Sequence, residues 1–229
     1  MVNLALEAYL REDVFGVLEF LAAQNPDGKV LRACQELAAK IYWDKKDLVG
    51  VVAVSLFGLS LGWRIANSLD GEEETSVIFS ITKAIAYNLA SFTWPGWDES
   101  GIQIGHTDLT IGLSAAKINL RLAHELNKGN LPLARANWML AAHYLAQKEY
   151  THAERNFALS ATHALEADEQ AEVLLAEGFQ VLTLLLAGLR ESGASEKRLN
   201  EVKEKLRLLE NGSGFIGQLD TAQRVFSAS

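Results

Sequence analysis

Apolar residues recur along almost the whole chain at intervals of three and four positions, the spacing that gathers them on one face of an α-helix. Short clusters of turn-forming residues interrupt this pattern, and the strongest are Asn25-Pro26-Asp27-Gly28, Asp70-Gly71, Lys128-Gly129-Asn130 and Asn211-Gly212-Ser213-Gly214. The pattern predicts helices over residues 4–23, 29–43, 48–69, 72–92, 107–127, 132–147, 150–165, 168–190 and 195–210. We expect the tail, residues 211–229, to be flexible or to hold a short helix.

Roughly ten helices joined by short turns imply that neighbouring helices run antiparallel. Only 3 prolines occur in 229 residues, which suits long helices because proline disrupts a helix interior. We therefore expect one all-α domain over residues 1–229, with a long loop at residues 94–106.

An uncharged stretch runs from Leu48 to Trp63. A membrane-spanning helix needs about 20 apolar residues, and this stretch is shorter. Gly58 and Gly62 stand four positions apart, a spacing that lets two helix backbones approach closely. We interpret the stretch as a helix buried on all sides in a soluble protein, with no membrane contact.

Charge and cysteine content narrow the functional classes. The formal net charge of −8 disfavours binding to the phosphate backbone of a nucleic acid. The basic residues from Lys197 to Arg207 alternate with glutamates, as on a solvated helix face. The single cysteine, Cys34, excludes an intrachain disulfide and lies among apolar helical residues, so we expect it to be buried. The chain starts without the basic segment of a secretion signal, and we expect a cytoplasmic protein.

One segment of the chain has the spacing of a known repeat. Leu140, Ala141 and Tyr144 occupy first-helix positions of the tetratricopeptide pattern, and Ala153 and Phe157 occupy second-helix positions. Over residues 134–165 the chain therefore resembles a tetratricopeptide repeat. The small alanines would let the two helices cross closely, while the aromatic rings would fill the space beside the crossing. The resemblance implies helix hairpins stacked into a right-handed superhelix; another bundled or right-angled all-α fold is the alternative.

The same resemblance implies a concave surface that binds a segment of another protein. In this sequence the residues projecting from it would be Arg135, Trp138, Ala142 and Leu145. Tryptophan and arginine are favoured anchors in such interfaces, so an apolar or amphipathic segment would suit this surface. The alternative is that Trp138 only packs against the preceding helix.

The most unusual string of residues lies in the predicted loop, where Trp94 and Trp97 flank Pro95-Gly96 and precede Asp98 and Glu99. Two tryptophans are costly to leave in water, so the loop is expected to be pinned against the protein's own helices. The alternative is a lid over a ligand or metal pocket, with His106 as a further candidate, because long ordered loops are often functional.

No motif for a catalytic nucleophile, a phosphate-binding loop or a metal site occurs in the sequence. Our first hypothesis is a non-catalytic scaffold, without cofactor or metal, that binds a protein partner. The second is a helical small-molecule- or metal-binding protein, or an enzyme, with a pocket beneath the 94–106 loop. End repeats without polar caps leave apolar faces to cover, which favours a homodimer.

Overall fold

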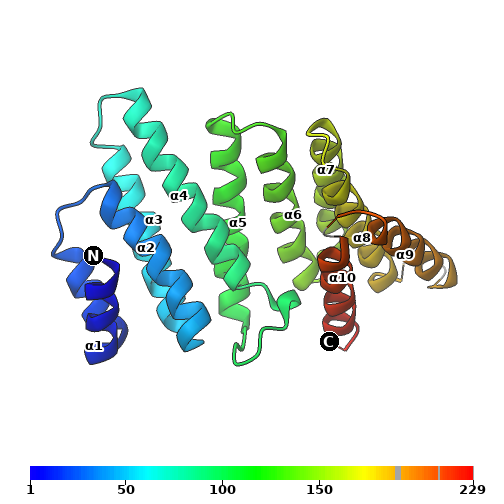
Figure 1. Ribbon diagram of the computed structural model, residues 1–229, viewed down its shortest axis with the longest axis horizontal. Helices are drawn as coiled ribbons and strands as arrows, with labels where there is room; N and C mark the ends of the chain where they lie inside the picture. The colour runs from blue at the N-terminus through cyan, green and yellow to red at the C-terminus, as the bar shows by residue number, and fades with distance from the viewer. Residues whose placement is uncertain (189–191, 211, 229) are drawn as a thin grey trace. The chain divides into compact units, whose positions relative to one another are not determined.

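The computed structural model describes residues 1–188, 192–210 and 212–228 (Figure 1). These residues form ten α-helices, a π-helical turn and a short 3-10 helix, and they contain no strand. The predicted all-α class and number of helices are therefore confirmed. The sequence led us to expect one domain over residues 1–229, whereas the structure describes two compact units. Unit 1 comprises residues 1–93 and 101–126, and unit 2 comprises residues 94–100 and 127–229.

Unit 1 holds five helices that pack as successive neighbours. These are α1 (Val2–Ala22), α2 (Gly28–Lys40), α3 (Leu48–Ala66), α4 (Glu72–Phe92) and α5 (His106–Glu125), with a π-helical turn (Ile41–Lys45) after α2. In Figure 1, α3, α4 and α5 each fold back along the helix before them. Asp27 starts α2 by accepting hydrogen bonds from the backbone N–H groups of Lys29 and Val30.

Helix α1 is kinked in its middle, a feature that the sequence pattern did not predict. Asp13 has a φ of 64°, which interrupts the helical backbone. Before the kink, the Tyr9 hydroxyl donates a hydrogen bond of 2.8 Å to Asp47, the residue that precedes α3. Burial and the nearby Asp47 carboxylate raise the pKa of Tyr9 above its ordinary value, so this donor stays protonated. The bond ties α1 to the start of α3.

Helix α3 lies at the centre of unit 1, where it contacts α1, α2 and α4. Two of its three glycines, Gly58 and Gly62, face α2 and α4. A Cβ added to Gly58 would lie 3.1 Å from both Cys34 Cβ and Ile85 Cδ1, and one added to Gly62 would overlap the Thr82 hydroxyl. The spacing read from the sequence thus allows α3 to approach α2 and α4 closely.

Helix α3 is also the one helix, within the described ranges, that is long and apolar enough to cross a membrane. Of its most apolar window, 56% is buried inside the protein. The core helix of a soluble protein meets the same criterion. The expectation that this helix is buried on all sides is wrong, because Val49 and Leu56 are exposed, at 71% and 44%.

Unit 2 begins its helical part with three helices of equal length. They are α6 (Asn130–Ala146), α7 (Tyr150–Glu166) and α8 (Gln170–Leu186), each of 17 residues. Lys148 and Asp168 turn the chain between them with φ values of 60° and 58°. The helices start twenty residues apart, so a pair with its turns is longer than the 34-residue tetratricopeptide repeat.

The two turns share one hydrogen-bonding pattern. The N–H groups of Glu149 and Glu169 donate to the carbonyl oxygens of Tyr144 and Ala164, at 2.9 and 3.0 Å. A left-handed residue followed by this bond is a common way to end a helix. The turn after α7 therefore forms without the proline of the tetratricopeptide pattern, whose position Leu165 occupies.

The hairpin of α6 and α7 contains the two alanines that the repeat pattern singled out. Ala141 and Ala153 are both fully buried, as is Phe157. Small residues continue along the pair, because Ala134 of α6 and Ala164 of α7 form a buried cluster with Val173 of α8. These side chains supply the close packing of unit 2.

The last two helices differ from the prediction. Helix α9 (Ser192–Arg207) begins before Ser195, which is buried within it and does not cap it. Of the two alternatives for the tail, the described part forms the helix, because residues 212–227 are helix α10 (Gly212–Ser227), which is longer than the short helix expected. Leu219 and Ala222 are fully buried, which fixes α10 in place. Residues 189–191, which include the predicted end of the preceding helix, and residues 211 and 229 lie outside the described ranges.

The Gly62→Ala variant tests the close approach of α3. Alanine favours a helix over glycine by about 1 kcal/mol, but its Cβ would overlap the buried Thr82 side chain, which is held by a hydrogen bond of 2.9 Å to Ile78 O. Because overpacking a core costs about 1–3 kcal/mol, we expect a lower melting temperature by circular dichroism. Gly217→Ala is the control: residue 217 is exposed in α10 with open space at its Cβ, and the melting temperature should stay or rise.

Cys34 gives a second test of the unit 1 core. Its side chain is fully buried, as the sequence predicted, and burial raises the pKa of the thiol to about 12. Below that pH the thiol is neutral and shielded, so it is a poor nucleophile. We expect no reaction with a thiol-specific disulfide reagent at pH 8 in buffer and one equivalent of reaction in denaturant. Rapid reaction of the native protein would contradict the described packing.

Candidate functional site

Unit 2 holds a short segment from outside its α-helices, Trp94–Ser100, against the side chains of those helices. Pro95–Trp97 forms a single 3-10 turn, and Asp98 ends it in the left-handed conformation with a φ of 50°. A Cβ at residue 96 would overlap the Trp94 ring, so only glycine lets that ring fold back over the turn. The Trp-Pro-Gly-Trp sequence therefore encodes a compact turn with two aromatic side chains.

Trp94 is the anchor of this segment. Its ring is 1% exposed, and its indole Nε1 donates a hydrogen bond of 2.9 Å to the carbonyl oxygen of Ala142 on α6. The ring lies edge-to-face against Trp138, with centroids 5.3 Å apart, and tilted against Phe179 of α8 at 6.0 Å. Aromatic pairs in such geometries are worth about 0.5–1.5 kcal/mol beyond their burial.

Trp97 completes the segment's contact with α6. Its ring stacks on Trp138 at 5.9 Å and meets Trp94 edge-to-face at 4.7 Å. Trp97 is only half-buried, so its outer side faces solvent. Behind Trp138, Phe157 and Phe179 stack on each other at 5.3 Å. We call these residues of α6, α7 and α8, together with the two loop tryptophans, the aromatic cluster: Trp94, Trp97, Trp138, Phe157 and Phe179.

The structure brings together two groups of residues that the sequence singled out separately. Trp138 and Ala142, expected on an open concave surface, are instead buried under the chain's own Trp94–Ser100 segment. Leu145 is also buried. Arg135 is the exposed member of the predicted groove, and it bonds to Glu172 of α8 at 2.9 Å. Three of the four residues predicted to line an open groove are therefore buried within unit 2.

The polar residues of the predicted loop site belong to different units. The Asp98 carboxylate pairs with Arg224 of α10 at 2.6 Å, with both side chains at least half-exposed. His106 is the first residue of α5 and belongs to unit 1, whereas Asp98 and Glu99 belong to unit 2. Within the described ranges, no group of three histidine, cysteine or acidic side chains is placed to hold a metal ion.

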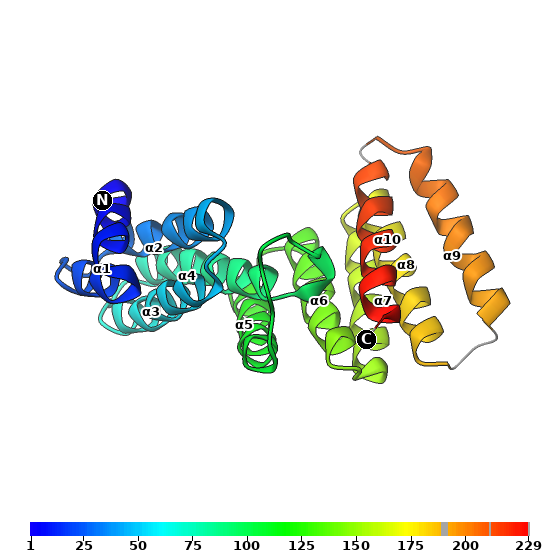
Figure 2. The ribbon, with the colours of Figure 1, turned by 90° about the horizontal axis from the view of Figure 1, so that it is seen from below.

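Helix α10 also packs against the segment. It contacts α8, α9 and the Pro95–Trp97 turn, and Figure 2 shows it running alongside α8. Phe226 lies 6.0 Å from Trp94, and Leu219 packs on Gly178, whose added Cβ would be 2.8 Å from Leu219 Cδ1. Lys203 of α9 pairs with Asp220 at 2.6 Å. Sequence reasoning missed this role of α10, although the apolar spacing of Leu219, Ala222 and Phe226 is the signal for it.

One polar atom in the aromatic cluster has no partner. Trp138 is 5% exposed, and its indole Nε1 has no hydrogen-bond acceptor among the described residues. A buried donor without an acceptor costs about 1–3 kcal/mol. The internal segment therefore leaves one hydrogen bond of this site unmade.

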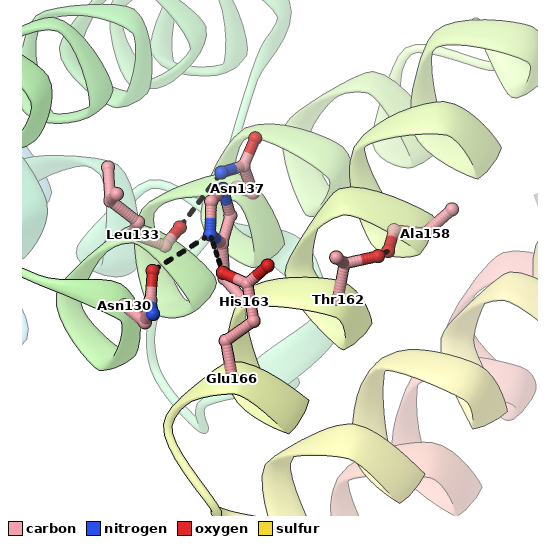
Figure 3. Close-up of polar contacts among 7 residues, drawn as sticks. All are labelled: Asn130, Leu133, Asn137, Ala158, Thr162, His163 and Glu166. Atoms are coloured by element: carbon pink, nitrogen blue, oxygen red, sulfur yellow. Dashed lines mark hydrogen bonds and ion pairs between the residues drawn. The ribbon is translucent and has the colours of Figure 1, made fainter.

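A second polar group in unit 2 lies at the start of α6 and the end of α7 (Figure 3). His163 Nδ1 lies 3.3 Å from Asn130 Oδ1 and 3.5 Å from Glu166 Oε2. Figure 3 shows all three side chains converging, with the nearby Asn137 amide donating to the Leu133 carbonyl at 2.9 Å. The contact of His163 with Glu166 lies within one turn of α7. The contact of His163 with Asn130 joins the end of α7 to the start of α6, so it braces the hairpin.

Unit 1 has a separate apolar depression of about 140 Å³ between α3, α4 and α5. Leu56 borders it and is 44% exposed. The remaining walls are Leu59, Leu89, Thr110, Ile111, Ser114, Ala115 and Ile118. The sequence gave no sign of this depression, because it depends on how three helices pack. It carries no charged side chain.

Comparison of the chain with protein-family models, with curated proteins and with solved structures gave no match. The candidate site must therefore be judged from its own geometry.

The Trp94→Phe variant tests the anchor. Phenylalanine keeps an apolar ring but loses the N–H that bonds to Ala142 and leaves part of the pocket empty. Together these changes should lower the free energy of unfolding by about 2 kcal/mol. Trp97→Phe, at the half-buried neighbour, should cost less than about 1 kcal/mol, because a stacked ring is retained. Urea unfolding followed by circular dichroism compares the two, and equal losses would be inconsistent with this assignment of the anchor.

Proposed function

We propose that the chain is a non-catalytic helical scaffold that binds a segment of a protein partner on the face of unit 2 formed by α6, α8 and α10. The observation that supports this proposal is the seated segment Trp94–Ser100. The segment is remote in sequence from the helices that hold it, and it presents its side chains from a single 3-10 turn, Pro95–Trp97.

The interactions that hold the segment are those of peptide recognition. Large aromatic side chains enter a pocket lined by Trp138 and Phe179, one hydrogen bond reaches a backbone carbonyl, and one exposed ion pair fixes the acidic residue. Tryptophan anchors in a desolvated pocket supply most of the binding energy in such interfaces. A helical surface with these features is suited to an aromatic-bearing segment of another protein.

The stacked helix hairpins are consistent with a tetratricopeptide-like scaffold, and we keep this class of architecture as part of the proposal. We also propose a cytoplasmic location, since the one cysteine is a buried free thiol, as is common in reducing compartments. The proposed partner is a protein; nucleic acid is disfavoured by the net charge of −8.

Emptying the site should allow a segment to bind from outside. In the full-length Trp94→Ser/Trp97→Ser variant, the pocket on α6 and α8 loses its internal occupant. A fluorescently labelled peptide with the sequence of residues 92–100 should then bind with a dissociation constant in the micromolar range. This corresponds to a binding free energy of about −8 kcal/mol. Fluorescence anisotropy measures this binding, and circular dichroism checks that the variant keeps its helices.

The control peptide carries serine in place of both tryptophans and should bind at least about tenfold more weakly, because the aromatic rings supply the burial. If the folded variant binds neither peptide, or binds both equally, the proposed function is wrong.

A further inference from the structure

We propose that this face of unit 2 recognises partners by a Trp-x-x-Trp-Asp-like motif, meaning two large aromatic side chains followed by a carboxylate. We further infer that Trp94–Ser100 occupies the site as an internal copy of this ligand. The inference rests on the proposed function and adds the chemistry of the partner and the state of the site before binding.

The aromatic part of the motif follows from the two tryptophan positions. The first position is a closed pocket, where Trp94 is fully buried and bonded to Ala142 O. The second is a half-open platform, where Trp97 stacks on the face of Trp138. A partner therefore needs an indole at the first position, because only an N–H on a large ring reaches the carbonyl. Any large aromatic ring fits the second.

The acidic part of the motif follows from Arg224. Its guanidinium bonds to Asp98, the residue directly after the second tryptophan, and the pair is exposed to solvent. Arg224 belongs to α10, which also places Phe226 6.0 Å from Trp94. A partner's carboxylate at this position would meet the same cation, so binding should weaken as salt concentration rises.

Two features of the internal copy make it replaceable. Its outer contact is an exposed ion pair, which contributes little to stability. It also leaves the Trp138 indole N–H without an acceptor among the described residues. An external segment that supplies a carbonyl or carboxylate to this N–H gains a hydrogen bond that the internal copy lacks. Such a partner can compete although the internal segment is tethered.

The experiment compares full-length proteins that differ in how well the internal copy fits. Gly96→Ala forces the Trp94 ring away from its turn, because the new Cβ would overlap that ring, and it changes no residue of α6, α8 or α10. Gly105→Ala is the control in the same loop, where the nearest atom would be 3.5 Å from the new Cβ. The probe is the labelled peptide with the sequence of residues 92–100.

We expect Gly96→Ala to bind the peptide at least about tenfold more tightly than the wild type, and Gly105→Ala to match the wild type. If the wild type binds the peptide as tightly as the emptied Trp94→Ser/Trp97→Ser variant, the internal copy does not occlude the site and the inference is overturned, while the proposed function stands. If none of these proteins binds, both fail. The Trp97→Ser variant replaces Gly96→Ala should the latter lose its helical signal.

A charge exchange tests the acidic position. In the background of the emptied variant, Arg224→Glu should weaken binding of the peptide about fivefold or more at low salt. A peptide with lysine at the position of Asp98 should restore the affinity for Arg224→Glu and lose affinity for the arginine form. Because a structural effect of the substitution would weaken both peptides alike, absence of this reciprocal rescue overturns the assignment of Arg224.

Discussion

Unit 2 depends on the burial of one side chain that its own helices do not supply. Trp94 precedes the turn Pro95–Trp97, yet it fills the space between α6, α8 and α10 and bonds to the backbone of α6. Three consequences follow from this one contact. The aromatic face of α6 is covered, α10 gains a surface to pack on, and the Pro95–Trp97 turn is held against the helices of unit 2.

The arrangement links the structural and the functional interpretation of the tryptophan-rich loop. The sequence left open whether the loop is pinned to the protein or is a lid over a site, and the structure shows the pinning. It is pinned, because Trp94 is buried and Asp98 is paired with Arg224. It also covers Trp138 and Ala142, two residues that we expected to project from a binding surface. A scaffold of this kind would stay closed to weak, nonspecific apolar contacts, because a competitor must replace two stacked rings and a hydrogen bond.

Much of the fold could be read from the sequence because its causes are local. Turn residues such as Asp27, Asp70 and Gly129 mark helix ends, and helical apolar spacing runs between them. The small side chains on α3 and α6 predicted close helix packing, and Gly58 and Gly62 do face neighbouring helices. The kink at Asp13 escaped prediction, because the sequence there has helical spacing; the nearby signal is Gly16, where an added Cβ would lie 2.5 Å from Glu12 Cβ.

The site could be predicted only in pieces. Trp138 and Trp94 each stood out as costly to expose, but their contact joins segments far apart in the chain, and no periodicity encodes it. The Asp98–Arg224 pair is more remote still. The packing of α10 was not predicted from the sequence, because Leu219 of α10 contacts Gly178 of α8, a residue far away in the chain. Contacts between distant parts of the chain therefore decide which of the residues singled out in the sequence come together in one site.

The hydrogen exchange rate of the Trp94 indole N–H, followed by NMR, tests the central claim most directly. In the free protein this proton should exchange slowly, since it is buried and bonded to Ala142 O. Saturating amounts of an external peptide with two tryptophans and a following aspartate should speed its exchange by at least about tenfold, while the indole proton of Trp63 in unit 1 stays unchanged. A Trp94 proton whose exchange does not respond to a peptide that binds this face would contradict the account.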